Sequence, residues 1–165
     1  MILLLLFPFL SQASFDTDMR DHLKWDNVGI ARAVSDVGQI TMMVAPFVVA
    51  GMNKCNRKEN LLASGLAMGF NKLITGGIKY VTGRERPDGS NKLSFPSGHT
   101  SSAFTSAALV CGMADRYTCV TGLLIASSVG YLRIAGDRHW ASDVAVGMAL
   151  GVANGVLIPK LVMTW

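Results

Sequence analysis

One histidine and one aspartate have the types and the spacing that nucleophilic catalysis needs. His139 precedes Asp143 by four residues, a spacing that places two side chains on one face of a helix. The carboxylate would accept the Nδ1 proton of the imidazole and leave the Nε2 lone pair free to attack an electrophile. An isolated pair of this kind is most often an ordinary helix-surface interaction, so its surroundings decide between the two interpretations.

A second patch, Pro96-Ser97-Gly98-His99, stands where an apolar segment begins. The start of a helix offers backbone N–H groups and the positive end of the helix dipole to an anion, and Gly98 lets a ligand approach the backbone closely. His99 would donate a proton to a leaving oxygen, which is the general-acid role. The alternative interpretation of Ser97 is a common helix N-cap.

Three cations complete the candidate site. Lys79 and Arg86 stand in a third patch, residues 79–87, and Arg133 precedes His139 by six residues. A phosphoryl group in its transition state spreads negative charge over several oxygens, and a cluster of permanent cations stabilises that species. The residues therefore predict phosphoryl transfer.

Two further arginines have a simpler interpretation. Arg84 and Arg138 each stand next to an acidic residue, Glu85 and Asp137 respectively. Surface pairs of this kind are common and contribute little, so we expect these arginines to be solvated or paired with those neighbours, the alternative being direct contact with phosphate.

Five apolar segments separated by short polar turns must position these residues, and their length and Ala, Leu, Met and Gly content favour helices. They cover residues 38–53, 60–82, 100–114, 119–133 and 141–159. We predict an all-α fold, a compact bundle of five to six helices, with a shorter amphipathic helix at 16–35. An up-and-down path brings the three patches to one end, where the active site is expected. The opposite end would carry the basic residues Lys54, Arg57, Lys58, Arg116 and Lys160, as the positive-inside rule requires of cytoplasmic turns.

Composition limits the class of protein. The chain has 165 residues, of which 50% are apolar and 16% charged, and its net charge is 15 − 11 = +4. These values fit one folded domain and exclude a disordered chain. A mean hydropathy of +0.37 allows either a soluble bundle or one in a membrane. The basic residues are scattered without interleaved aromatic residues, so no nucleic-acid partner is expected.

The N-terminus resembles an export signal. Residues 1–13 contain an apolar run followed by small residues ending at Ala13, and they predict a signal peptide, the alternative being a retained membrane anchor. Residues 14–36 would form an N-terminal amphipathic segment and residues 37–165 the helical bundle. The protein is expected to be exported and membrane-associated, with its active site facing the periplasm or the exterior.

The cysteines give no indication of a metal site. Cys55, Cys111 and Cys119 have no metal-ligand spacing, so neither a metal nor a cofactor is expected. Cys111 and Cys119 either form a disulfide across a helical turn or are small buried apolar residues.

Together the three patches resemble the signature of the type 2 phosphatidic-acid phosphatase and vanadium haloperoxidase superfamily. That signature reads Lys-x6-Arg-Pro, Pro-Ser-Gly-His and Ser-Arg-x5-His-x3-Asp, and ten of its positions match here in order and spacing. Leu132 stands where the family usually has Ser, which removes a possible hydroxyl donor.

The resemblance implies a role for each matching residue. His139 would be the nucleophile that forms a phosphohistidine, Asp143 its orienting partner, and His99 the acid that protonates the leaving alcohol. The phosphoryl oxygens would be bound by Lys79, Arg86, Ser97, Gly98 and Arg133.

We therefore expect a metal-independent phosphatase that hydrolyses phosphomonoesters or pyrophosphates. Its substrate would be a phosphorylated lipid or a small phosphoester, and the protein would be associated with the membrane. Three alternatives stay open at this stage. They are a soluble acid phosphatase of broad specificity, a vanadate-dependent haloperoxidase, and a non-catalytic phospholipid-binding membrane protein. The sequence does not determine the oligomeric state.

Overall fold

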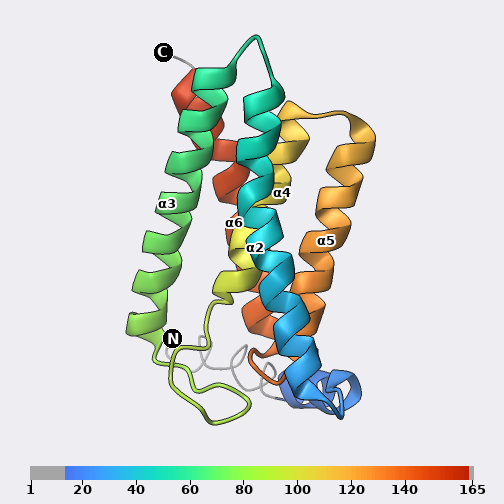
Figure 1. Cartoon of the computed structure of the whole chain (residues 1–165). Helices are drawn as coiled ribbons and strands as arrows, with labels where there is room; N and C mark the ends of the chain where they lie inside the picture. The colour runs from blue at the N-terminus through green and yellow to red at the C-terminus, as the bar shows by residue number, and fades with distance from the viewer. Residues whose placement is uncertain (1–13, 164–165) are drawn as a thin grey trace.

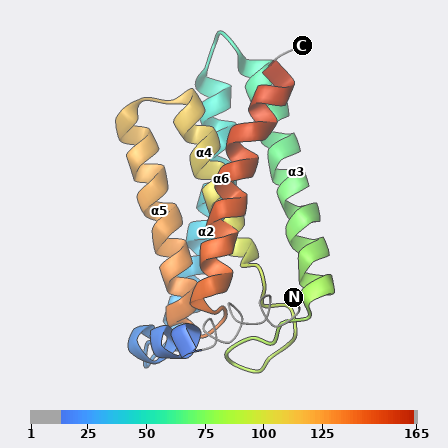
Figure 2. The same cartoon turned by 180° about the vertical axis from the view of Figure 1, so that it is seen from behind.

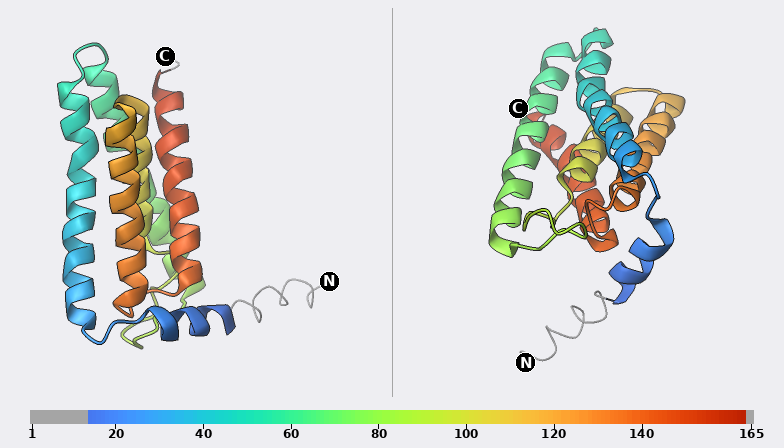
Figure 3. Two further views of the ribbon diagram at one scale, coloured as in Figure 1. Left: turned by 90° about the vertical axis from the view of Figure 1, so that its right-hand side faces the viewer. Right: turned by 60° about the horizontal axis from the view of Figure 1, so that its bottom comes forward.

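The structure is a computed structural model, and it describes residues 14–163. Five long helices run up and down beside one another (Figure 1). A further helical segment, residues 14–23, lies across the lower end of the bundle (Figure 3). The predicted all-α bundle is confirmed, while the signal peptide expected at residues 1–13 lies outside the described residues. The five helices are α2 (Val28–Met52), α3 (Arg57–Thr82), α4 (Gly98–Met113), α5 (Arg116–Ala135) and α6 (Ala141–Met163).

The N-terminal part is divided differently from the expectation. The amphipathic helix expected at 16–35 is interrupted at residues 24–27, and α2 begins at Val28. Asn27 causes this boundary, because its side-chain oxygen accepts a hydrogen bond from the N–H of Ile30 at 3.2 Å and so caps the new helix. The expected division after residue 36 consequently falls inside α2.

Helix α4 is the centre of the bundle and packs against α2, α3, α5 and α6. Small and hydroxyl-bearing side chains dominate its buried residues, including Ser101, Ser102, Ala103, Thr105 and Ala107. Small side chains let neighbouring backbones come close on every side. Figure 2 shows α6 lying directly over α4 in the view from behind.

A ladder of glycines sets the distance between α4 and α6. Gly147, Gly151 and Gly155 recur every fourth residue and face α4. A Cβ at Gly147 or Gly155 would lie 2.6 Å from a backbone carbonyl oxygen of α4 or its N-cap, and one at Gly151 would lie nearer still to that of Ser101. Only glycine allows this contact, which brings the start of α4 against the start of α6.

The outer surface of the bundle is apolar. Exposed side chains include Ile40, Val44 and Phe47 on α2, with Leu66 and Leu73 on α3. Within residues 14–163, four helices are long and apolar enough to cross a membrane, namely α2, α3, α5 and α6. Polar groups are instead inside, where Asn71 accepts hydrogen bonds from other buried side chains. This arrangement is typical of a bundle surrounded by lipid.

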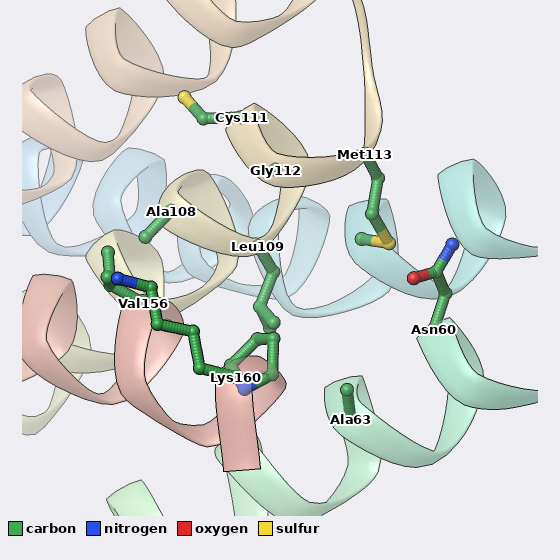
Figure 4. Close-up of a pocket in the computed structure, with 11 residues that line it drawn as sticks. Asn60, Ala63, Ala108, Leu109, Cys111, Gly112, Met113, Val156 and Lys160 are labelled. Carbon is green, nitrogen blue, oxygen red and sulfur yellow. The ribbon is translucent and has the colours of Figure 1, made fainter. Parts of the chain in front are cut away.

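The two ends of the bundle differ. The lower end in Figure 1 collects the end of α3, the start of α4, the end of α5 and the start of α6, together with the loop 83–97. The other end carries the exposed thiol of Cys55 and a disulfide between Cys111 and Cys119. A pocket of about 660 Å³ lies there between α3, α4 and α6 (Figure 4). Its lining is mainly apolar and contains none of the predicted site residues.

Candidate active site

The lower end of the bundle carries every residue selected from the sequence. Each lies at a helix end or in an adjoining loop, because the up-and-down path returns the chain to this end twice, after α3 and after α5. The residues are Lys79, Arg86, Ser97, Gly98, His99, Arg133, His139 and Asp143.

His139 lies in the turn between α5 and α6, not on the same helix as Asp143 as the four-residue spacing suggested. Its N–H donates to the carbonyl oxygen of Arg133 at 3.2 Å. Asp143 belongs to the first turn of α6, and its Oδ2 lies 3.7 Å from the Nδ1 of His139. That distance is too long for a hydrogen bond, but such contacts in enzymes commonly shorten when substrate binds. The turn between α5 and α6 therefore places the imidazole of His139 beside the carboxylate of Asp143.

The carboxylate of Asp143 is held rigidly. It accepts hydrogen bonds from the hydroxyl of Ser94 at 2.5 Å, from Nη1 of Arg84 at 2.6 Å and from the N–H of Trp140 at 2.9 Å. The carboxylate is completely buried, so these three donors replace its hydration. Asp143 is therefore fixed in one orientation beside the imidazole.

Burial determines the charge of His139, whose side chain is only 2% exposed. Loss of hydration, opposed by Asp143 and helped by the cations Lys79, Arg86 and Arg133, lowers the pKa of this imidazole to about 4. The imidazole is consequently neutral at neutral pH. A neutral ring keeps a lone pair for nucleophilic attack.

Two arginines present buried nitrogen atoms that have no acceptor. Arg86 donates through Nε to Asn91 at 2.9 Å, and Arg133 donates through Nη1 to Asp36 at 2.8 Å. Nη1 of Arg86 and Nε of Arg133 are buried and have no partner. Among the described residues, only Nδ1 of His139 shares this property. Leaving a charged donor unsatisfied is costly, so these nitrogens point to an anionic ligand with several oxygens.

Lys79 binds the loop that precedes α4. Its ammonium group donates to the carbonyl oxygens of Leu93 at 2.7 Å, Ser94 at 3.3 Å and Pro96 at 2.6 Å. All three contacts are to backbone oxygens, so the lysine holds this loop against the end of α3. Lys79 lies next to the site, as the sequence predicts. The contacts of its ammonium group, however, are with backbone oxygens of the protein.

Ser97 is the N-cap of α4, as the alternative interpretation proposed. Its hydroxyl lies 2.9 Å from Oγ1 of Thr100, and its N–H donates to the carbonyl oxygen of Asp143 at 3.0 Å. Gly98 and His99 follow as the first two residues of the helix. Nε2 of His99 lies 3.0 Å from Asp36.

The predicted partners of the two other arginines were wrong. Arg84 forms ion pairs with Asp16 and Asp143, both at 2.6 Å, in place of Glu85. Arg138 pairs with Asp88 at 3.1 Å. The reason is that α6 and the loop 83–97 bring distant carboxylates closer than the adjacent ones. Asp137 instead forms ion pairs with Arg20 at 2.6 Å and with Lys24 at 3.0 Å.

The departure from the signature at Leu132 is accommodated by packing. Leu132 is buried in a small apolar cluster with Ala31 of α2 and Ala135. Its side chain contributes to the contact between α2 and α5.

Sequence reasoning missed two aspartates. Asp36 contacts both Arg133 and His99, and Asp16, which is 1% exposed, contacts Arg84. Asp36 stands with Arg32 in a helix that is otherwise largely apolar, and charged residues in such a helix are a signal of function. A pocket of about 440 Å³ opens beside Asp36. It is lined by Arg32, Asp36, Gln39, Ile40, His99, Arg133 and Arg138.

Two curated proteins are similar to this chain in sequence. Lipid A 1-phosphatase of Porphyromonas gingivalis is 35% identical over 131 residues, or 75% of the chain. Decaprenylphosphoryl-5-phosphoribose phosphatase of Mycobacterium tuberculosis is 34% identical over 118 residues, or 64% of the chain. The chain spans only 29% and 63% of the lengths of these relatives.

Two crystal structures share the fold. LpxE of Aquifex aeolicus has a TM-score of 0.71 and 21% identity, covering 90% of this chain and 94% of that one. The transmembrane PAP2 type phosphatidylglycerolphosphate phosphatase of Bacillus subtilis also has a TM-score of 0.71, with 19% identity and a coverage of 99% and 96%. The family model of the PAP2 superfamily matches residues 60–165, which include all eight candidate site residues. The chain therefore belongs to the PAP2 superfamily.

Proposed function

We propose that this protein is a metal-independent phosphatase that hydrolyses phosphomonoesters or pyrophosphates of lipids through a phosphohistidine intermediate. One observation supports this above all: two buried guanidinium nitrogens without acceptors, from Arg86 and Arg133, stand at the same end as a buried, neutral imidazole. The arginines provide for a phosphoryl group and the imidazole provides a nucleophile.

The reaction has two steps. In the first, Nε2 of His139 attacks phosphorus, the bond to the leaving oxygen breaks, and His99 donates a proton to that oxygen. Asp143 stabilises the positive charge that develops on the ring of His139. In the second, water attacks the phosphohistidine, His99 takes a proton from the water, and inorganic phosphate leaves His139 in its neutral form.

The phosphoryl oxygens are bound by groups from all three motifs. Arg86 and Arg133 supply the free nitrogens described above, and Gly98 supplies the N-terminus of α4. Lys79 acts at this end both as a positive charge and as the residue that holds the loop preceding α4. Ser97 belongs to the same turn, and its hydroxyl caps the helix.

The apolar outer faces of α2, α3, α5 and α6 support a lipid substrate, because the site lies at the end of a bundle that can span a membrane. The two curated relatives support the same class, since both are named for phosphates carried on lipids. These features speak against the soluble acid phosphatase that the sequence left open.

The proposed orientation follows from the basic residues. The end opposite the site carries Lys54 in the turn after α2, Arg57 and Lys58 at the start of α3, and Arg116 at the start of α5. The positive-inside rule assigns such turns to the cytoplasm, so the active site faces the periplasm or the exterior.

A turnover assay tests the function. We expect the purified protein in detergent to release inorganic phosphate from a panel of lipid monophosphates and diphosphates, with the same rate in EDTA. Acid-labile labelling by a ³²P substrate should appear in the wild type and not in His139→Ala. Absence of phosphate release from the whole panel would refute the proposal, and bromination by the vanadate-loaded protein would favour the haloperoxidase alternative.

A further inference from the structure

Asp36 joins two residues of the candidate site. Its Oδ1 lies 2.8 Å from Nη1 of Arg133 and 3.0 Å from Nε2 of His99. The aspartate belongs to α2, which lies outside residues 60–165 matched by the family model. Its side chain is 54% exposed and borders the pocket of about 440 Å³. Asp36 therefore contacts the candidate site from a helix that carries none of the three motifs.

Positive charge surrounds His99 from several elements. Arg133 of α5, Arg86 of the loop 83–97 and Lys72 of α3 face it, and His139 is a further neighbour that becomes positive during the reaction. Arg32 and Arg138 line the same pocket, each bonded to Asp88. Burial is the largest effect on His99, and with Arg133, Lys72 and Arg86 it holds the pKa of this ring well below its usual value. Among the described residues, Asp36 is the carboxylate in contact with the ring.

The nitrogen atoms of the Arg133 guanidinium group differ in their partners. Nη1 donates to Asp36 and to the hydroxyl of Ser35, whereas Nε has no partner. A phosphoryl oxygen can therefore bind Nε while Asp36 keeps its contact with Nη1. Asp36 has no need to leave when a phosphate binds.

We propose that Asp36 is a positioning residue for the general acid, the counter-ion that stabilises the protonated form of His99 and holds its ring beside Arg133. The proposal rests on the phosphatase function proposed above. His99 gives its proton to the leaving oxygen and remains hydrogen-bonded to Asp36 as a neutral ring. It then accepts one proton from the attacking water, so that Asp36 itself neither gains nor loses a proton over the cycle.

The pH profile of kcat tests this role. We expect Asp36→Asn to move the alkaline limb to lower pH by about 1 to 3 units, because the nearest carboxylate to the acid is lost. Asp36→Glu should restore most of the shift, and KM should change less than about 3-fold. Asp26→Asn, which removes an exposed negative charge at the same end, is the matched control and should keep the wild-type profile.

The leaving group provides a second readout. Release of p-nitrophenolate needs little protonation, so the rate defect of Asp36→Asn should be smaller with p-nitrophenyl phosphate than with an alkyl phosphate. A purely structural defect would lower both rates equally. Should Asp36→Asn fail to fold, Asp36→Ser takes its place in both measurements.

The outcomes separate the two proposals. An unchanged alkaline limb in an active Asp36→Asn protein would overturn the role of Asp36, and so would a lower KM with an unchanged profile, which would identify Asp36 as a competitor of phosphate for Arg133. A wild-type protein that hydrolyses no phosphate would refute the phosphatase function itself.

Discussion

Asp16 and Arg84 form an ion pair of 2.6 Å although they are 68 positions apart in the chain. The same guanidinium group donates to Asp143, also at 2.6 Å. Asp16 further accepts hydrogen bonds from the N–H of Ser142 at 2.8 Å and from its hydroxyl at 2.6 Å. The helical segment 14–23 is thereby connected, through a single arginine, to the aspartate beside the proposed nucleophile.

The same segment also binds the turn that carries His139. Arg20 and Lys24 pair with Asp137, and Arg20 and Arg84 both lie near the ring of Trp140, at 5.9 and 5.7 Å from its centroid. These contacts hold the segment against the turn. Residues 14–24 therefore contribute to the order of the site although they lie outside the region matched by the family model.

The first prediction concerns Asp16. We expect Asp16→Asn to lower kcat about 10-fold with little change in KM, since one charge-assisted hydrogen bond that orients Arg84 is weakened. Asp18→Asn changes an exposed residue of the same segment and should leave kcat unchanged. Steady-state kinetics in one detergent give both values. Equal effects of the two substitutions would show that Asp16 has no specific role.

The proposed nucleophile gives the second prediction. His139→Ala should reduce phosphate release by at least about 10⁴-fold, as expected when a residue that forms the covalent intermediate is removed. Its far-UV circular dichroism should match that of the wild type. Hydrolysis at more than a tenth of the wild-type rate in the folded variant would exclude His139 as the nucleophile.

The third prediction is the charge of His139. Burial lowers its pKa to about 4, so the ring should stay neutral as the pH falls from 7 to 5 and gain its proton near pH 4. Nitrogen-15 NMR of histidine-labelled protein measures this directly, and His139→Gln identifies the signal among the three histidines. A midpoint at or above pH 6.5 would contradict the inferred neutrality.

The fourth prediction tests the contact between α4 and α6. Gly151→Ala should destabilise the protein by about 1 to 3 kcal/mol, because the new methyl group would overlap the backbone of α4. Gly65→Ala is the control, since a Cβ there meets no atom within 4 Å. Thermal unfolding in the same detergent compares them. Similar midpoints for both variants would show that the two helices can separate at no cost.

The fifth prediction concerns orientation in the membrane. Cys55 is exposed in the basic turn opposite the site, so in a Cys111→Ser/Cys119→Ser background it should react with a membrane-impermeant maleimide only after cells are permeabilised. Labelling in intact cells would reverse the proposed orientation. Cys111 and Cys119, bonded to each other in the structure, lie at the same end, so the proposed orientation requires that they be free thiols in cells, because disulfides persist in oxidising compartments; recovery of their disulfide from alkylated wild-type cells would therefore also reverse the orientation.

Local features of the sequence were sufficient to predict helices α3 to α6 and the end of the bundle at which the candidate residues lie. Apolar runs between polar turns predicted α3 to α6 to within a few residues, since helix limits depend on nearby groups such as the cap at Ser97. The sequence could not place the start of α2, because the amphipathic pattern continues through residues 24–27 and the cap at Asn27 was not recognised.

The ion pairs around the site were decided by tertiary structure alone. Arg84 has an acidic neighbour in Glu85 but pairs with Asp16 and Asp143, and Asp36 meets Arg133 across 97 positions. Spacing along the chain predicts contacts within a few helical turns and carries no information about which distant carboxylate reaches an arginine. That choice depends on how the elements pack: the docking of residues 14–23 brings Asp16 to Arg84, and the packing of α2 against α5 brings Asp36 to Arg133.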